Sequence, residues 1–190
     1  MIDSALARRI RLVGLDVDGV LTDGAVFIGQ IQGQRVEMKR FDIQDGLGVK
    51  LLRQAGIAVV IVSGRQSEAT TLRAQEIGVD ELVQDGAARK LPAFEAILSR
   101  RLVKWDECAF VGDDIADLPL LRRVALPVAV ANAVPEVHAL ARYVTRAAGG
   151  QGAVRETAEV ILRARGVWEE LLNEYLRERG DAEPRAFGSR

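Results

Sequence analysis

Two aspartates, Asp16 and Asp18, stand one residue apart where an apolar run ends, in the segment RLVGLDVDGVLTDG at residues 11–24. Side chains at positions i and i+2 of an extended chain point to the same face, so these two carboxylates are expected to converge. Carboxylates that lie so close repel each other unless a cation lies between them or one of them keeps its proton. An Asp-Gly pair is also common in simple turns. The spacing alone is therefore compatible with a cation site, with acid–base chemistry and with an ordinary turn.

Two further apolar runs, at 57–62 and 108–111, also end in glycines and polar residues. The polar and glycine residues at these ends are Ser63, Gly64 and Arg65 after the first run, and Asp113, Asp114 and Asp117 after the second. Ser63 and Asp114 each also fit the pattern of an ordinary helix cap. However, the carboxyl ends of parallel strands meet at one edge of a sheet, and ligands of open α/β sheets bind there. The coincidence of these groups at three strand ends predicts a functional site at that edge.

Strands and helices are expected to alternate along the chain. The apolar runs typical of buried strands are 12–17, 57–62, 108–111 and 128–131, and short strands are also expected within 81–86 and 142–146. Helical patterns lie between them, and one helix is expected to have Asp45 as its N-cap and Gly56 at its end. The alternation predicts an α/β fold with a doubly wound, mostly parallel sheet that helices cover on both faces.

The 190-residue chain is expected to form one domain over residues 1–180, because its length is close to that of a single domain. Residues 25–41 predict two strands around a Gln/Gly turn, and therefore a β-hairpin that projects from the sheet. Residues 152–180 predict one long C-terminal helix with an apolar stripe, and residues 181–190 a flexible tail.

The composition argues against several classes of partner and location. The 26 Lys and Arg residues against 27 Asp and Glu residues leave a net charge of −1, which does not favour nucleic acid as a partner. The single cysteine, Cys108, cannot form a disulfide within the chain, so a reducing compartment is expected. No apolar run approaches the roughly 20 residues of a membrane-spanning helix, and the first residues lack a secretory apolar stretch. We therefore expect a soluble cytoplasmic protein with no nucleic-acid or membrane partner.

Four short motifs follow one another in a defined order. They are DVDG at 16–19, VSG at 62–64, the lysine of DGAARK at 85–90 and GDDIAD at 112–117. In these motifs, which span much of residues 10–165, the chain resembles the haloacid dehalogenase superfamily of phosphohydrolases. The resemblance implies a Rossmann-like core, Mg²⁺ as cofactor and hydrolysis of a phosphate ester through an aspartyl-phosphate intermediate.

The same resemblance implies a role for each motif residue. Asp16 is implied as the nucleophile, Asp18 as the general acid and base, and Lys90 as the cation that neutralises developing charge. Ser63 and Gly64 are implied to hold the phosphoryl oxygens. The remaining implied roles are Mg²⁺ ligation by the side chains of Asp16 and Asp113 and the main-chain carbonyl of Asp18, support of the metal shell by Asp114, and positioning of the lysine by Asp117.

The spacing of the motifs leaves no room for a cap domain, since the stretch between Asp18 and Ser63 holds only the hairpin and one helix. KRFDIQDGLGVKLL, GDDIADLPLL and YVTRAAGGQGAVRE resemble the cap-less family that hydrolyses 3-deoxy-D-manno-octulosonate 8-phosphate in lipopolysaccharide precursor synthesis. That resemblance implies a homotetramer in which the 25–41 hairpins meet. It also implies that the glycine-rich stretch and helix at 145–165 reach a neighbouring active site. This sequence has GGQG where several relatives have GGRG.

A phosphorylated keto sugar acid is a doubly anionic substrate and favours additional cations and donors in the site. The candidate substrate-binding residues are Ser63, Gly64, Arg65, Arg73, Thr22 and Arg155, with Lys39 and Arg40 as further cations. An alternative substrate is a nine-carbon 3-deoxy keto acid 9-phosphate of the sialic-acid type. A non-catalytic binding module on the same fold is disfavoured because the full set of motif residues is present.

Overall fold

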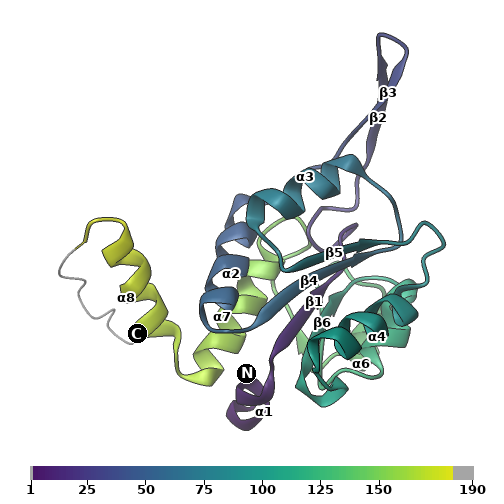
Figure 1. The fold of residues 1–190 in the computed structure, drawn as a ribbon. Helices are drawn as coiled ribbons and strands as arrows, with labels where there is room; N and C mark the ends of the chain where they lie inside the picture. The colour runs from purple at the N-terminus through teal and green to yellow at the C-terminus, as the bar shows by residue number, and fades with distance from the viewer. Residues whose placement is uncertain (1, 182–190) are drawn as a thin grey trace.

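A computed structural model of the chain describes residues 2–181, so residues 182–190 of the predicted tail lie outside the described part. Its centre is one sheet of six parallel strands (Figure 1). In spatial order the strands are β5 (Glu81–Gln84), β4 (Ala58–Ser63), β1 (Leu12–Leu15), β6 (Cys108–Gly112), β7 (Leu126–Ala129) and β8 (Tyr143–Val144). The predicted parallel sheet and both additional short strands are confirmed. The strand predicted at 128–131 begins and ends two residues earlier.

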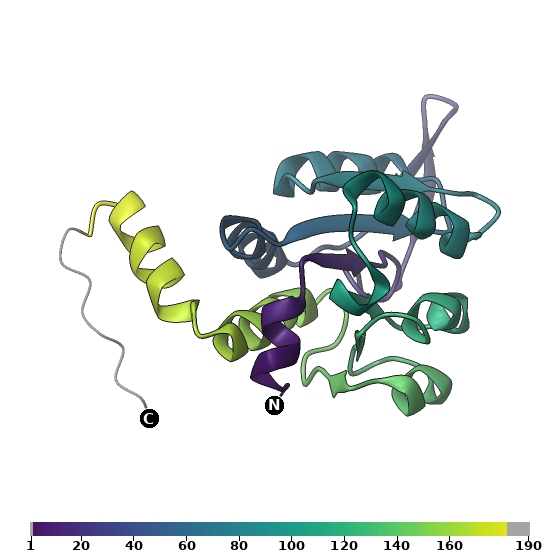
Figure 2. The same ribbon diagram turned by 60° about the horizontal axis from the view of Figure 1, so that its bottom comes forward.

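Helices cover both faces of the sheet, as predicted (Figures 1 and 2). On one face lie α1 (Ser4–Arg9), α2 (Ile43–Gln54), α3 (Glu68–Ile77) and α7 (Ala153–Arg165), and α8 (Trp168–Glu178) packs against α7 to one side of the sheet (Figure 1). On the other face lie α4 (Lys90–Arg101), α5 (Leu118–Leu121) and α6 (Pro135–Leu140), with the short 3₁₀ turns η1 (Trp105–Glu107) and η2 (Ile115–Asp117) on the connections. Among the described residues, no helix has the length and apolar character needed to cross a membrane.

Side chains of the central strands alternate between two apolar cores. In β4, Val59 and Ile61 pack into the core beneath α2 and α7, whereas Val60 and Val62 pack into the core beneath α4. A strand that is buried on both faces needs apolar residues at every position, because its successive side chains point to opposite faces. The run AVVIV at 58–62 therefore has no polar residue until Ser63, where the strand reaches the edge of the sheet.

The sheet places the three motif-bearing strands side by side. β1 pairs with β4 on one side, with Leu12 opposite Ala58, and with β6 on the other, with Leu12 opposite Cys108. The residues that follow these strands therefore share one edge of the sheet, as parallel pairing predicts.

The predicted hairpin is present and stands apart from the sheet. Strands β2 (Phe27–Ile31) and β3 (Gln34–Met38) form an antiparallel pair that projects well beyond the body of the molecule (Figure 1). Its large apolar side chains Phe27, Ile28, Ile31 and Met38 are between 58% and 64% exposed. An isolated two-stranded hairpin has little stability of its own, and this one leaves its apolar side chains largely open to solvent.

Two expectations about helix ends were wrong. The N-cap of α2 is Asp42, whose side chain accepts the amide of Gln44, and Asp45 lies within the first turn. Asp45 is buried and accepts the amide of Arg155 at 2.8 Å, so it caps the start of α7 from a different helix. The single long helix predicted at the C-terminus is divided into α7 and α8, because Gly166 adopts a left-handed φ of +81° and ends α7.

Candidate active site

A buried lysine joins two carboxylates at the edge of the sheet. Lys90 Nζ lies 2.7 Å from Oδ1 of Asp16 and 2.7 Å from Oδ1 of Asp117. All three side chains are buried. Lys90 is the first residue of α4, where the helix dipole disfavours a cation, so the two carboxylates offset both the dipole and the loss of hydration. Burial alone would lower the pKa of Lys90, but the two carboxylates raise it above its ordinary value. The lysine therefore stays charged.

Asp117 has both of its oxygens engaged. Oδ1 accepts Lys90 Nζ, and Oδ2 accepts the amide of Asp113 at 3.1 Å. A side chain at Gly112 would meet Asp117 Oδ2 at 2.6 Å, so this approach needs glycine there. The lysine contact predicted for Asp117 is present, and each Asp117 oxygen already accepts one hydrogen bond.

Asp113 completes a group of three carboxylates with oxygens within 4.8 Å of one another, the others being Asp16 and Asp117. Burial and the Asp117 carboxylate raise the pKa of Asp16 to about 6. Burial beside Asp16 and Asp117 raises the pKa of Asp113 to about 8. Asp113 Oδ1 is buried and has no hydrogen-bond partner. Three carboxylates against one ammonium leave an excess of negative charge, so the cluster favours a bound cation or a proton.

The loop after Asp18 is shaped around this cluster. Gly19 has a left-handed φ of +90°, and a Cβ there would lie 2.0 Å from Asp113 Oδ2. Thr22 is fully buried, and its hydroxyl accepts the amides of Gly19 and Gly24 and donates to the Val17 carbonyl. Thr22 therefore holds the loop through these hydrogen bonds, and its predicted contact with substrate stays a prediction.

The Asp18 carboxylate lies against residues at the base of the hairpin and in the turn after β4. Its Oδ1 lies 2.7 Å from Lys39 Nζ, and its Oδ2 lies 4.0 Å from Arg65 Nε. Lys39, expected to be a cation for the acidic sugar, has a fully buried side chain. Arg40, the other cation suggested, pairs with Asp23 at 3.2 Å and is exposed.

The turn after β4 packs against the turn that carries Lys90. Ser63 is buried and its hydroxyl accepts the amide of Arg65 at 3.2 Å. A Cβ at Gly64 would lie 3.0 Å from Ala88 Cβ and 3.8 Å from Lys90 Cε. The structure therefore brings together the predicted phosphoryl-binding pair and the predicted lysine.

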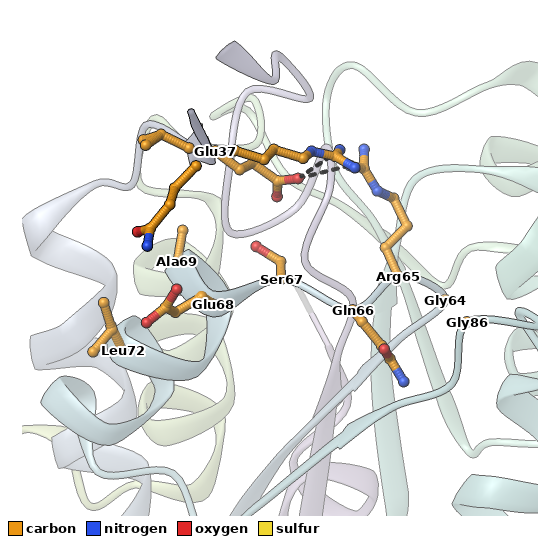
Figure 3. Close-up of a pocket in the computed structure, with 12 residues that line it drawn as sticks. Glu37, Gly64, Arg65, Gln66, Ser67, Glu68, Ala69, Leu72 and Gly86 are labelled. Atoms are coloured by element: carbon orange, nitrogen blue, oxygen red, sulfur yellow. Dashed lines mark hydrogen bonds and ion pairs between the residues drawn. The ribbon is translucent and has the colours of Figure 1, made fainter. Parts of the chain in front are cut away.

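A cleft of about 670 Å³ opens beside this turn, between the hairpin and the start of α3 (Figure 3). Arg65, Glu37 and Ser67 are among the residues that line it. Figure 3 shows the Glu37 carboxylate directed toward the Arg65 guanidinium, to which it pairs at 3.2 Å. Hydrogen bonding by Ser67 and the neighbouring cations Lys39 and Arg65 keep the pKa of Glu37 below its ordinary value, so it is ionised.

Three of the predicted residues have other contacts. Arg73 is buried and donates to the Asp42 carbonyl at 2.7 Å and to Glu76 at 2.9 Å. The Arg155 side chain donates to Glu159 at 2.7 Å and stacks over Trp168. Asp114 is exposed and accepts the amide of Ile115 at 2.7 Å. Neither arginine is held at the carboxylate cluster, and their predicted substrate contacts stay predictions.

The glycine-rich stretch packs against the loop after Asp18 within the same chain. A Cβ at Gly149 would lie 1.8 Å from the Gly19 carbonyl oxygen, and the amide of Gly150 donates to the Val20 carbonyl. Asn132 joins the two segments, since it donates to the Gly19 carbonyl at 3.1 Å and accepts the amide of Gly149 at 2.6 Å. The sequence analysis did not single out Asn132, and its only signal was a polar residue soon after a strand.

This arrangement matches known enzymes. A family model described as haloacid dehalogenase-like hydrolase matches residues 80–156. The 3-deoxy-D-manno-octulosonate 8-phosphate phosphatase of Escherichia coli (strain K12) is 42% identical over 166 residues, which are 87% of this chain and 86% of that protein. The chain belongs to the haloacid dehalogenase-like hydrolases, in the family of these octulosonate phosphatases. The superfamily resemblance drawn from the four motifs is confirmed.

Solved structures of the octulosonate phosphatase family share this fold. The enzyme of Moraxella catarrhalis, crystallised in complex with magnesium ion, phosphate ion and KDO, matches with a TM-score of 0.85 and 34% identity, over 90% of this chain and 97% of that one. The cobalt-bound form of the Haemophilus influenzae enzyme matches with a TM-score of 0.77 and 34% identity, over 85% of this chain and 92% of that one.

Proposed function

We propose that this chain is a Mg²⁺-dependent phosphatase that hydrolyses 3-deoxy-D-manno-octulosonate 8-phosphate to the free keto sugar acid and phosphate. The observation that carries the proposal is the buried group of Asp16, Asp113, Asp117 and Lys90 at the carboxyl edge of the sheet. The names of relatives that are 42% identical, and the ligands of the Moraxella catarrhalis enzyme, support the choice of substrate and metal. The reaction would serve lipopolysaccharide precursor synthesis.

The residues present fit a magnesium ion. Mg²⁺ prefers carboxylate and carbonyl oxygens and usually keeps several waters. Asp16 and Asp113 would supply carboxylate oxygens, and the main-chain carbonyl of Asp18 is proposed as a third ligand. The unpartnered, buried Asp113 Oδ1 supports this, because a desolvated carboxylate oxygen without a donor is satisfied by a cation. A bound Mg²⁺ would neutralise charge on the phosphate and on the attacking carboxylate.

The chemistry then assigns one role to each side chain. Asp16 attacks phosphorus in line, the bond from phosphorus to the sugar oxygen breaks, and Asp18 gives its proton to the departing alkoxide. Asp18, now a carboxylate, takes a proton from the water that hydrolyses the aspartyl-phosphate. Lys90 holds Asp16 in place and offsets charge that develops on the phosphoryl oxygens, with Ser63 and the Gly64 amide as further donors.

The decisive experiment compares phosphorylated sugar acids as substrates, with Mg²⁺ and with EDTA. We expect release of phosphate from the eight-carbon 8-phosphate, with kcat/KM above that for the nine-carbon 9-phosphate, and loss of activity in EDTA that added Mg²⁺ restores. A preference for the nine-carbon substrate would replace the proposed substrate. Activity that survives in EDTA, or no phosphate from either compound, would contradict the proposed chemistry. An Asp16→Asn variant, which keeps the shape but not the nucleophile, is the matched control.

We propose further that four chains assemble through their hairpins. Phe27, Ile28, Ile31 and Met38 form an exposed apolar hairpin surface, and an apolar surface of this kind on a soluble protein marks an interaction site. An uncapped active site is also open to water, which assembly would reduce. Sedimentation of the wild type should give about four chains, and Ile28→Lys should give smaller species. A monomeric, fully active wild type would contradict the proposal.

We also propose that the enzyme works in the cytoplasm. The one cysteine, Cys108, is free and buried, and burial raises the pKa of its thiol to about 12, so it is inert and suited to a reducing compartment. Fractionation of producing cells should recover the phosphatase activity with cytoplasmic markers, and recovery with periplasmic markers would contradict this location.

A further inference from the structure

A buried lysine from the hairpin base holds the proposed acid–base residue. Lys39 lies directly after β3, its side chain is 0% exposed, and its Nζ is 2.7 Å from Asp18 Oδ1. The ammonium donates a hydrogen bond to the Thr70 hydroxyl at 3.3 Å. Burying an ammonium costs several kcal/mol unless it is paired and hydrogen-bonded, roughly as estimated for ion pairs in protein interiors. A fully buried lysine is therefore kept here by its contact with Asp18.

Four charged groups form a closed ring around this contact. Glu37 Oε1 lies 3.8 Å from Lys39 Nζ, and Glu37 Oε2 accepts Arg65 at 3.2 Å. Arg65 Nε in turn lies 4.0 Å from Asp18 Oδ2, which closes the ring. The Glu37 to Arg65 side of the ring is visible at the rim of the cleft (Figure 3). With Asp18 ionised, the two carboxylates and two cations balance, and when Asp18 holds the proton for the leaving group the ring carries one positive charge.

The side chains of the ring differ in how deeply they are buried. Lys39 is buried completely, whereas the Asp18 side chain is 23% exposed and that of Arg65 is 44% exposed. Oδ1 of Asp18 is therefore buried against Lys39, whereas Oδ2 lies nearest the more exposed Arg65. A general acid has to lie within hydrogen-bond reach of the atom that receives its proton, so such an anchor matters for the rate.

We propose that Lys39 is a positioning residue that aims the Asp18 carboxyl at the oxygen of the departing sugar. This inference rests on the proposed phosphatase function. Glu37 lies in β3, and Lys39 follows this strand directly. The position of the hairpin therefore affects the position of the Asp18 carboxyl and, through it, the transfer of the proton.

The first test compares two leaving groups in a Lys39→Met variant. A sugar alkoxide leaves poorly without a proton, whereas p-nitrophenolate leaves readily as an anion. We expect kcat for the sugar acid 8-phosphate to fall by about 10²-fold, the low end of what general acid catalysis contributes. The rate of the first-turnover release of p-nitrophenol from p-nitrophenyl phosphate should change little. Lys50→Met is the control for loss of a lysine in an ion pair, because Lys50 pairs with Glu178 at 2.6 Å on the exposed surface.

The second test is a double-mutant cycle with Asp18→Asn. If Lys39 acts through Asp18, then Asp18→Asn and Asp18→Asn/Lys39→Met should have the same residual rate within about twofold. The double variant also removes both members of the buried pair, which avoids leaving an unpaired charge. Thermal unfolding checks that every variant is folded.

Three results separate the inference from the proposed function. Equal losses with both leaving groups, or a further loss in the Asp18→Asn background, would show that Lys39 supports the fold only and would overturn the inference. A Lys39→Met variant as active as the wild type would also overturn it and leave the phosphatase proposal intact. A wild type that hydrolyses no sugar acid phosphate would overturn both.

Discussion

Replacing Gly149 by alanine should slow the reaction without unfolding the protein. A Cβ at this position would lie 1.8 Å from the Gly19 carbonyl oxygen and 2.7 Å from that of Thr22. Gly149 has an ordinary negative φ, so alanine adds no backbone strain and the clash is the whole perturbation. Real Cβ atoms are essentially never closer than 3.0 Å to a neighbour, so one of the two backbone segments has to move.

The required movement sets the expected magnitude. Opening 1.8 Å to at least 3.0 Å shifts the Gly19 carbonyl or the Gly149 backbone by a little over 1 Å, unless both segments share the movement. Gly19 follows Asp18 directly, and its own Cα faces Asp113, so the loop transmits the shift to the proposed acid and metal ligand. A misplacement of about 1 Å in a reacting geometry costs on the order of 10²-fold in rate. Overpacking costs roughly 1–3 kcal/mol in the free energy of unfolding.

The assay measures kcat at saturating sugar acid 8-phosphate and Mg²⁺, with urea unfolding of the same samples. Gly166→Ala is the matched control, because Gly166 has a left-handed φ of +81° but no atom within 4 Å of an added Cβ. It should lose about 1 kcal/mol of stability from backbone strain and keep its kcat. A Gly149→Ala enzyme with kcat close to that of the wild type would refute the idea that the glycine stretch positions the loop after Asp18.

Two further perturbations test the electrostatics of the fold. Lys90→Met leaves the buried carboxylates of Asp16 and Asp117 without their cation. In EDTA, this variant should have a free energy of unfolding about 3–5 kcal/mol below that of the wild type. A loss below about 1 kcal/mol, which is the range of exposed ion pairs, would contradict this expectation. Burial raises the pKa of Asp45 to about 6, although the Arg155 amide donates to it, so the folded state binds this proton more tightly than the unfolded chain does. The tighter binding of this proton adds to the free energy of unfolding below the unfolded pKa of about 3.9. This stabilisation, about 3 kcal/mol, is lost as the pH rises through 6. Relative to the wild type, Asp45→Asn should therefore gain stability between about pH 4 and pH 7 in urea unfolding, and a difference that does not vary with pH would count against the buried charge.

Much of the active site was predictable because its parts are local in sequence. Asp16, Ser63 and Asp113 each follow an apolar run, and parallel pairing of neighbouring strands brings such positions to one edge. Lys90 was predicted differently, from the resemblance of DGAARK at 85–90 to the lysine motif of the superfamily, and it opens the helix that follows. The strand ends needed only the alternation of strands and helices, whereas the lysine needed the family's order of motifs.

The contacts that were not predicted join segments far apart in the chain. Asp45 reads as a helix N-cap by spacing, yet it caps α7 because α2 and α7 pack together on one face of the sheet. Arg73 was predicted as a cation for an acidic substrate, and the structure adds a contact that the sequence did not indicate, because its guanidinium donates to the Asp42 carbonyl, 31 residues away in the chain. A sequence pattern gives the chemistry that a side chain can perform, and only packing decides which neighbour it meets.

The sequence by itself determined the sheet, the edge where the site lies and the residue types that gather there. Those depend on hydrophobic periodicity and on the fixed geometry of parallel strands, which hold for any chain with this pattern. The tertiary structure alone decided that Lys39 is buried against Asp18, that Asn132 donates to the Gly19 carbonyl, and that Gly149 touches Gly19. The physical reason is that hydrogen bonds and ion pairs act over a few ångströms, and such distances between remote segments exist only after the chain has folded.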